Sequence, residues 1–251
     1  MPTHGRLRLT TTEAESGAKR TTELDYVRSE GRLTVVVPGP GSPGWYRDLL
    51  DHPFVEVRLD EQELGLIAVP SEDGRTVALE RAPGENGAAP AEVRTLADKL
   101  LEIHAWLRAQ LAHVTAESEA HFASPNGSGA PLGLQIRQHC LAFCEALSHH
   151  HNGEDAGVFP GIAAHHPHLR ETLDRLTEEH RTVARIKEGL VALLADIGTA
   201  DPERFRTELA RMSKELTAHL DYEEEWLIPV LAEVPFPPMR DTARRSPSVS
   251  S

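Results

Sequence analysis

Between residues 93 and 234, apolar side chains recur at alternating intervals of three and four residues, in four segments. This interval places them on one buried stripe of an amphipathic α-helix. Glycine or proline interrupts the interval at residues 123–133, 165–168 and 198–201, and Asp201 is placed to cap the last helix. Four helices joined by short connections predict an up-down four-helix bundle.

Each of the four predicted stripes contains a histidine, and two of them also contain a glutamate four residues later. A single histidine on such a stripe is most often a core residue that is hydrogen-bonded to a neighbour. The two glutamates are a different case from a single histidine. Burial of an ionised carboxylate beside neutral imidazoles, without a cation, would cost on the order of several kcal/mol for each glutamate. A metal ion removes that cost. The six candidate metal ligands are His104, His150, Glu154, His180, His219 and Glu223.

Two further details of the stripes lead to expectations. Strict spacing would bury Lys187, and we expect Ile186 in its place, because an unpaired buried ammonium group is costly. Cys140 and Cys144 lie four residues apart on one helix face. We expect them to be reduced core thiols and not a disulfide.

The bundle contains an internal repeat. In SHHHNGEDAGVFP and TAHLDYEEEWLIP, a histidine is followed by a glutamate after four residues and by a proline after six more. The repeat selects His150 as the metal ligand that pairs with Glu154. His151 is kept as an alternative, either as an additional metal ligand or as a side chain that holds a ligand in place. The other histidines are expected on the surface or in loops, namely His113, His121, His139, His149, His165, His166 and His168.

Each half of the repeat, with the lone histidine before it, supplies two nitrogens and one carboxylate, which suits two metals bridged by two carboxylates. Imidazole and carboxylate ligands without thiolate are typical of iron, manganese or zinc. Zinc prefers closed four-coordinate sites, so we expect two iron ions, with manganese as the second choice.

The residues that carry this site resemble a known family over about residues 93–234. LEIHAWLRAQL, SHHHNGEDAGVFP, TEEHRTVARI and TAHLDYEEEWLIPVL are similar to the hemerythrin-like, histidine-histidine-glutamate cation-binding domains. The resemblance implies a pair of non-haem irons. Oxygen-carrying members use five histidines and two carboxylates, with His-x-x-x-His on the third helix, whereas here His180 has Leu176 and Ala184 at those positions. Six ligands would leave positions open for dioxygen, peroxide or nitric oxide.

The first third of the chain has a different period. From Arg6 to Arg81, short alternating runs are separated by glycine, proline and Asp-Gly, which predicts about six strands in a small barrel or sandwich. One short helix is expected at Trp45–Asp51, and a hairpin turn at residues 71–74.

These strands resemble a second family over about residues 7–69. LRLTTTEAESGAKRTTELDYVRSEGRLTVVV and GWYRDLLDHPFVEVRL look like the deazaflavin-dependent nitroreductases, which implies a split β-barrel. Where that family has Gly-Arg-Lys-Ser-Gly to bind phosphate, residues 13–17 are Glu-Ala-Glu-Ser-Gly, and acidic groups repel phosphate. We interpret the barrel as a structural, docking or homodimerising module. The alternative is a bound flavin or deazaflavin that feeds electrons to the irons.

The predicted fold is therefore α+β with two domains. Residues 1–81 form the barrel, 82–92 a linker rich in glycine, proline and alanine, 93–234 the bundle, and 235–251 a disordered tail.

Composition restricts the partners. The formal charge of -13 disfavours nucleic acid and anionic membranes. The chain shows neither eighteen consecutive apolar residues nor an apolar run behind its N-terminal basic residues, so we expect a cytoplasmic protein without a membrane span.

The sequence predicts a di-iron protein that binds or activates dioxygen or peroxide, as an oxidase, oxygenase or peroxide scavenger, with or without a small-molecule substrate. A non-catalytic sensor or carrier of oxygen, nitric oxide or iron is the alternative, and a flavin-coupled oxidoreductase is the third reading.

Overall fold

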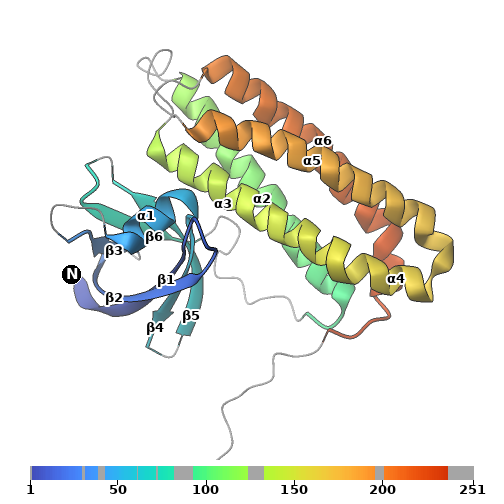
Figure 1. The fold of residues 1–251 in the computed structure, drawn as a ribbon, viewed down its shortest axis with the longest axis horizontal. Coiled ribbons are helices and arrows are strands. Elements are labelled where there is room, and N and C mark those ends of the chain that lie inside the picture. The colour runs from blue at the N-terminus through green and yellow to red at the C-terminus, as the bar shows by residue number, and fades with distance from the viewer. Residues whose placement is uncertain are drawn as a thin grey trace, which may run out of the picture.

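A computed structural model of the chain shows a β-barrel beside a helical bundle, which confirms the α+β, two-part architecture (Figure 1). The structure describes residues 2–29, 32–38, 43–60, 62–71, 73–81, 93–123, 133–195 and 201–236.

Six strands close the barrel in the order β1-β2-β3-β6-β5-β4, and every neighbouring pair, β4 with β1 included, is antiparallel. The helix α1 contributes Trp45, Tyr46 and Leu49 to the barrel core. In the hairpin between the last two strands, the backbone N–H of Gly74 donates to the carbonyl of Ser71, as expected. The elements are β1 (Thr3–Thr12), β2 (Lys19–Ser29), β3 (Arg32–Val36), α1 (Gly44–Asp51), β4 (Phe54–Leu59), β5 (Gln62–Pro70) and β6 (Thr76–Glu80).

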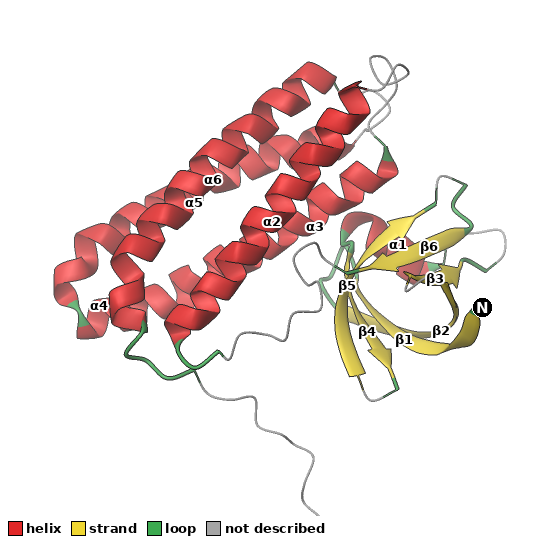
Figure 2. Ribbon diagram, turned by 180° about the vertical axis from the view of Figure 1, so that it is seen from behind, coloured by secondary structure: helices red, strands yellow, loops and turns green. Residues whose placement is uncertain are grey.

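Four long helices form the predicted bundle (Figure 2). Asp201 caps the last of them, because its carboxylate accepts hydrogen bonds from two backbone N–H groups of the first turn. Ile186 is buried and Lys187 is only partly buried, as expected. The elements are α2 (Leu96–Ala123), α3 (Leu134–Gly153), a π-helical turn (Glu154–Val158), α4 (Phe159–His165), a 3-10 turn (Pro167–Leu169), α5 (Arg170–Ala195) and α6 (Pro202–Leu231).

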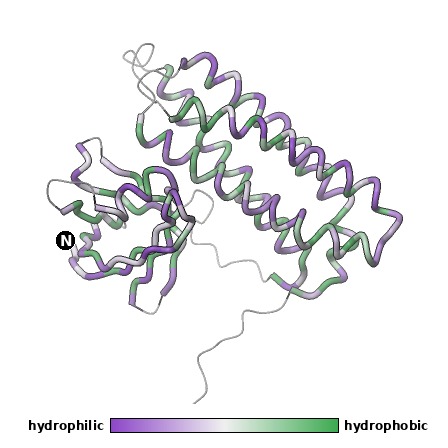
Figure 3. The backbone as a smooth tube through the Cα atoms, in the orientation of Figure 1, coloured by the Kyte–Doolittle hydropathy of each residue, from purple (hydrophilic) through white to green (hydrophobic). Residues whose placement is uncertain are grey.

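The interior of the bundle has three layers. One apolar cluster includes Leu107 and Leu220, and a second includes Leu100 and Leu227. Polar and apolar residues alternate along each helix (Figure 3). The buried polar side chain of His104 lies on α2 between Leu100 and Leu107, so the polar layer separates the two apolar clusters. Cys140 and Cys144 are buried and reduced, as expected.

The barrel packs on the bundle through β5, which is buried on both faces. Leu66 and Ala68 face the barrel core, whereas Ile67 and Val69 cluster with Ala142 of α3. A strand covered on both faces is expected to be continuously apolar, which explains why its second half, Leu-Ile-Ala-Val-Pro, does not alternate.

Arg137 of α3 adds polar contacts at the same boundary. Its guanidinium donates to the carbonyl of Leu50 in the barrel, and its Nε donates to the carbonyl of Leu194 at 3.1 Å. The arginine therefore ties the barrel to two helices of the bundle.

The predicted linker, residues 82–92, and most of the predicted tail lie outside the described residues. Two residues of that tail are ordered against the start of α2, because Pro235 forms a β-bridge with Thr95 and the Phe236 N–H donates to the carbonyl of Arg94 at 2.9 Å. Among the helices that the structure describes, none is long and apolar enough to cross a membrane.

Candidate metal centre

The six predicted side chains meet in the polar layer of the bundle. His104 and Glu223 have 0 % of their surface exposed, and His180, His219 and Glu154 are also buried. The side chain of His150 is 4 % exposed. All four long helices, together with the π-helical turn after α3, contribute to this layer.

The ligand atoms fall into two neighbouring groups. One group combines His104 and His150 with Glu154 and Glu223, and its atoms lie within 4.8 Å of one another. The Nε2 atoms of His104 and His150 are 3.1 Å apart. Adjacent nitrogens on one metal ion, at metal–nitrogen distances of about 2.1 Å, would be separated by about 3.0 Å. The second group consists of His151, His180 and His219.

His151 is the member that sequence reasoning kept only as an alternative. It is 7 % exposed, and its ring stacks on that of His180 with centroids 4.0 Å apart. The Nε2 atoms of His180 and His219 each lie 3.5 Å from a glutamate oxygen, Glu154 for His180 and Glu223 for His219. The two glutamates therefore lie between the two histidine groups.

His150 and His151 are neighbours in the last turn of α3, directly before a π-helical turn, and each contributes ligand atoms to one of the two groups. Pro160 has no N–H and disrupts regular helical hydrogen bonding, and the backbone ahead of it widens by one residue over Glu154–Val158.

The histidines are held from outside the cluster in a common way. In three of them Nδ1 contacts an acidic side chain, which leaves Nε2 directed inward. This arrangement is typical of metal-binding histidines, whose outer nitrogen is fixed by a carboxylate. The pairs are His104 with Glu224 at 2.8 Å, His180 with Asp155 at 2.9 Å and His219 with Glu179 at 3.0 Å.

The inner atoms of the cluster lack partners. Nε2 of His151, His180 and His219, and both carboxylate oxygens of Glu154 and Glu223, are buried without a hydrogen bond among the described residues. Buried polar atoms are normally satisfied, and unsatisfied ones are costly. Seven unpaired nitrogen and oxygen acceptor sites that converge on one layer fit a metal cluster, which would supply the missing positive charge.

Burial sets the protonation of the metal-free site. It raises the pKa of Glu154 to about 11, and the charge of Glu223 adds to the effect. Burial would also raise the pKa of Glu223, but the close contact with His104, whose Nε2 lies 3.5 Å from Glu223 Oε2, and the charge of that ring lower it to about 2. Burial lowers the pKa of His150 to about 3 and also lowers that of His151. These imidazoles are therefore neutral at pH 7, and their lone pairs are available to a metal.

A hollow of about 250 Å³ between α3 and α5 reaches this layer. His151 and His180 are among its lining residues, together with Asn152 and Arg181. Lys187 donates from Nζ to the Ser148 hydroxyl at 2.7 Å on the same wall. Small polar molecules therefore have a route to the second histidine group.

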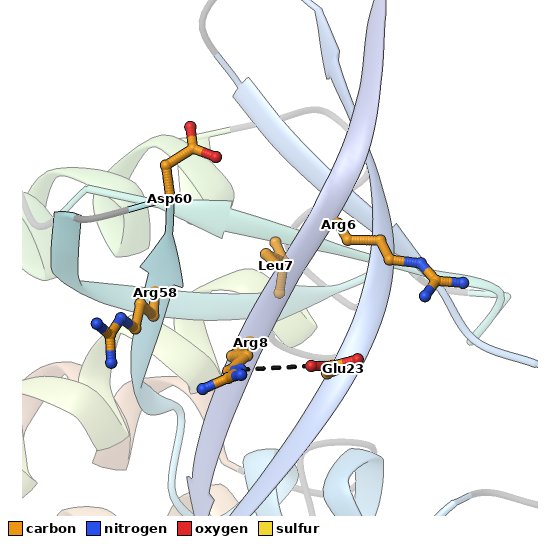
Figure 4. Close-up of a pocket in the computed structure, with 6 residues that line it drawn as sticks. All are labelled: Arg6, Leu7, Arg8, Glu23, Arg58 and Asp60. Atoms are coloured by element: carbon orange, nitrogen blue, oxygen red, sulfur yellow. Dashed lines mark hydrogen bonds and ion pairs between the residues drawn. The ribbon is translucent and has the colours of Figure 1, made fainter.

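Among its described residues, the barrel by itself holds no cluster of metal-ligating side chains like that of the bundle. A hollow of about 310 Å³ lies against β1, β2 and β4, and Figure 4 shows the exposed Arg8 paired with Glu23 there. In the turn where the resemblance placed phosphate binding, Glu13 pairs with Arg20, which also donates to Asp48 at 2.9 Å. Arg20 and Lys19, two cations beside that turn, are therefore already paired with carboxylates.

One histidine that we expected on the surface is buried, because His139 is only 2 % exposed. The expectation was wrong for His139 because the barrel covers this side of the bundle, and helical periodicity within the bundle cannot reveal such a cover.

Comparisons with known proteins agree with both halves of the architecture. The family model of the hemerythrin HHE cation binding domain matches residues 95–231, and that of F420H(2)-dependent quinone reductase matches residues 1–104. F420H(2)-dependent quinone reductases of Mycobacterium tuberculosis, strains CDC 1551 and H37Rv, are each 40% identical over 67 residues. That match covers 26% of this chain and 45% of the relatives, so the chain spans less than half of their length. A solved F420-H2 dependent reductase (FDR-A) is 21% identical, with a TM-score of 0.26, over 30% of this chain and 93% of its own.

Proposed function

Because the chain belongs to the hemerythrin HHE cation-binding family, we propose that its bundle holds a carboxylate-bridged pair of iron ions that binds or activates dioxygen or peroxide. The observation that carries this proposal is the set of unpaired imidazole and carboxylate atoms that converge beside an open hollow. Bound iron would supply redox chemistry and open coordination positions at this layer.

We assign the ligands by their grouping. His104 and His150 would hold one ion, and His151, His180 and His219 would hold the other. Glu154 and Glu223, which lie between the two groups, would supply the shared carboxylates. In this assignment, His151 replaces the histidine that is missing from the third helix of the family pattern. The set again contains five histidines and two carboxylates, supplied from different positions.

The surrounding residues keep the site ready to bind. Asp155, Glu179 and Glu224 hold the outer nitrogens of three histidines, so the rings cannot turn away. Arg108 donates to Glu224 at 2.6 Å and compensates its charge. The two apolar clusters on either side exclude water from the layer, so access is through the hollow.

Replacement of His151 by alanine is expected to weaken iron binding by at least about tenfold, because one ion would lose a nitrogen ligand. Iron affinity measured by competition with a chelator checks this result. His149→Ala is the matched control, since that neighbouring side chain is exposed. Equal affinities of the His151 variant and wild type would remove this residue from the ligand set and restore the six-ligand site.

Oxygen chemistry is tested on the iron-loaded full chain. After anaerobic reduction, the protein is mixed with dioxygen or hydrogen peroxide and followed by absorption spectroscopy, with Glu154→Gln as the reference. We expect rapid reoxidation, with oxygen or peroxide consumed over repeated cycles. A stable, reversible adduct without turnover would instead support the sensor or carrier function.

A second candidate function, electron supply from a deazaflavin in the barrel, is favoured by the family match over residues 1–104. The pairing of Arg20 with Glu13 and Asp48 weighs against it, because phosphate would have to displace both carboxylates. We therefore propose a docking role for the barrel. Tight, stoichiometric binding of a deazaflavin to the full chain would reverse that choice.

A further inference from the structure

A second cluster of metal-binding side chains lies where the barrel meets the bundle. His113 and Glu117 of α2, and His139 of α3, present ligand atoms within 4.8 Å of one another. Glu80, at the end of β6, reaches the same place from the barrel. These residues have no part in the proposed di-iron centre.

The cluster is separate from that centre. His113 lies nine residues after His104 on α2, which is about 13 Å along a helix. His139 lies eleven residues before His150 on α3, or about 16 Å. No single ion can therefore be shared between the two places.

His139 has an acidic side chain at each nitrogen. Its Nδ1 lies 2.7 Å from Glu117 Oε2, and its Nε2 lies 3.5 Å from Glu80 Oε2. A neutral imidazole has one N–H, so one carboxylate faces a lone pair unless a cation is present. A second proton would satisfy His139 alone. It would not account for His113, whose Nε2 lies 3.4 Å from the other oxygen of Glu117.

We propose that His113, Glu117 and His139 form a second metal site, for a divalent ion of the zinc type. The ion takes Nδ1 of His139 in place of its proton, which is released to solvent. Nε2–H of the same ring then donates to Glu80, the carboxylate–histidine–metal arrangement that orients metal ligands. Imidazole nitrogens and carboxylate oxygens are ordinary zinc ligands.

The neighbouring groups suit this assignment. Gln135 donates from Nε2 to Glu117 Oε1 at 2.8 Å, and Arg32 pairs with the other oxygen of Glu80. A cavity of about 600 Å³ between the barrel and the bundle is lined in part by Glu80, Glu117 and Gln135. Three protein ligands leave a fourth position that water from this cavity can take. The ion would be held by the bundle and linked to the barrel through the contact between His139 and Glu80.

The test counts both metals in the full chain. Protein already loaded with iron is incubated with zinc, desalted and analysed by elemental mass spectrometry. Wild type is expected to retain about one zinc per chain beyond its iron, and His113→Ala to lose it with unchanged iron. His113 is 35 % exposed in its side chain, so its removal should not unfold the protein.

His168→Ala, which changes an exposed histidine far along the chain, is the control and should bind zinc as wild type does. Glu80→Gln should retain the site with an affinity about 10–100-fold lower, because only the orienting carboxylate is lost. Equal zinc in wild type and His113→Ala, or no zinc retained by wild type, would overturn the proposal and leave His139 as a proton-bridged ion pair. The comparison does not depend on what the bundle centre does with oxygen.

Discussion

Replacement of Glu154 by glutamine is expected to reduce bound iron from about two ions per chain to less than one. The amide keeps the shape of the side chain but removes the charge and the second oxygen that a bridging carboxylate needs. Iron content after growth with added iron, measured by elemental analysis, checks this result. Glu225→Gln, an exposed glutamate on α6, is the matched control and should retain wild-type iron.

The same substitution should leave the metal-free protein at least as stable as wild type. Glu154 has an ordinary pKa near 4.3 when unfolded and about 11 in the metal-free fold, so at pH 7 it must take up a proton to fold. Glutamine is neutral at every pH and has no such requirement. The gain in folding stability of the metal-free variant over metal-free wild type is therefore absent below about pH 4 and increases as pH rises toward 11. A metal-free Glu154→Gln protein that was clearly less stable than wild type at pH 7 would contradict this reading of the layer.

Replacement of His219 by alanine is expected to remove most of the stability that iron confers. A ligand present at about 100 times its dissociation constant stabilises the folded state by about 2.7 kcal/mol. Wild type should show a difference of that order between iron-loaded and metal-free samples in denaturant unfolding. The variant should show almost none, because Nε2 of His219 is one of the inward-facing atoms.

The informative quantity is the difference in unfolding free energy between iron-loaded and metal-free samples, because His219→Ala also removes the contact between His219 and Glu179 in both states. Thr217→Ala, which changes an exposed residue on the same helix, should retain the full stabilisation by iron. An undiminished increment in the His219 variant would exclude this histidine from the site.

The bundle was predictable because burial repeats along a helix with a fixed period. On α2, residues spaced alternately three and four apart are buried in the structure, namely Ala97, Leu100, His104, Leu107, Leu111 and Val114. The cost of burying a charge also predicted correctly that Ile186, and not Lys187, occupies the buried position on α5. Periodicity and the electrostatic cost of burial together found the polar layer that unites the six side chains.

Two features required the three-dimensional structure. His151 is buried beside His150 although it lies one residue off the predicted stripe, and a single stripe of fixed period cannot show that two neighbouring residues are both buried. His139 is covered by the barrel, and the docking of one domain on another leaves little trace in the periodicity of either. The continuous apolar run of β5 was the available sign that this strand is buried on both faces.

The most direct test of the central claim is Mössbauer spectroscopy of the full chain produced with iron-57, together with its iron content. We expect about two irons per chain in a single, magnetically coupled pair, because the bridging glutamates would hold the ions side by side. Iron in less than stoichiometric amount, or a spectrum of isolated mononuclear iron, would contradict a di-iron centre in this bundle.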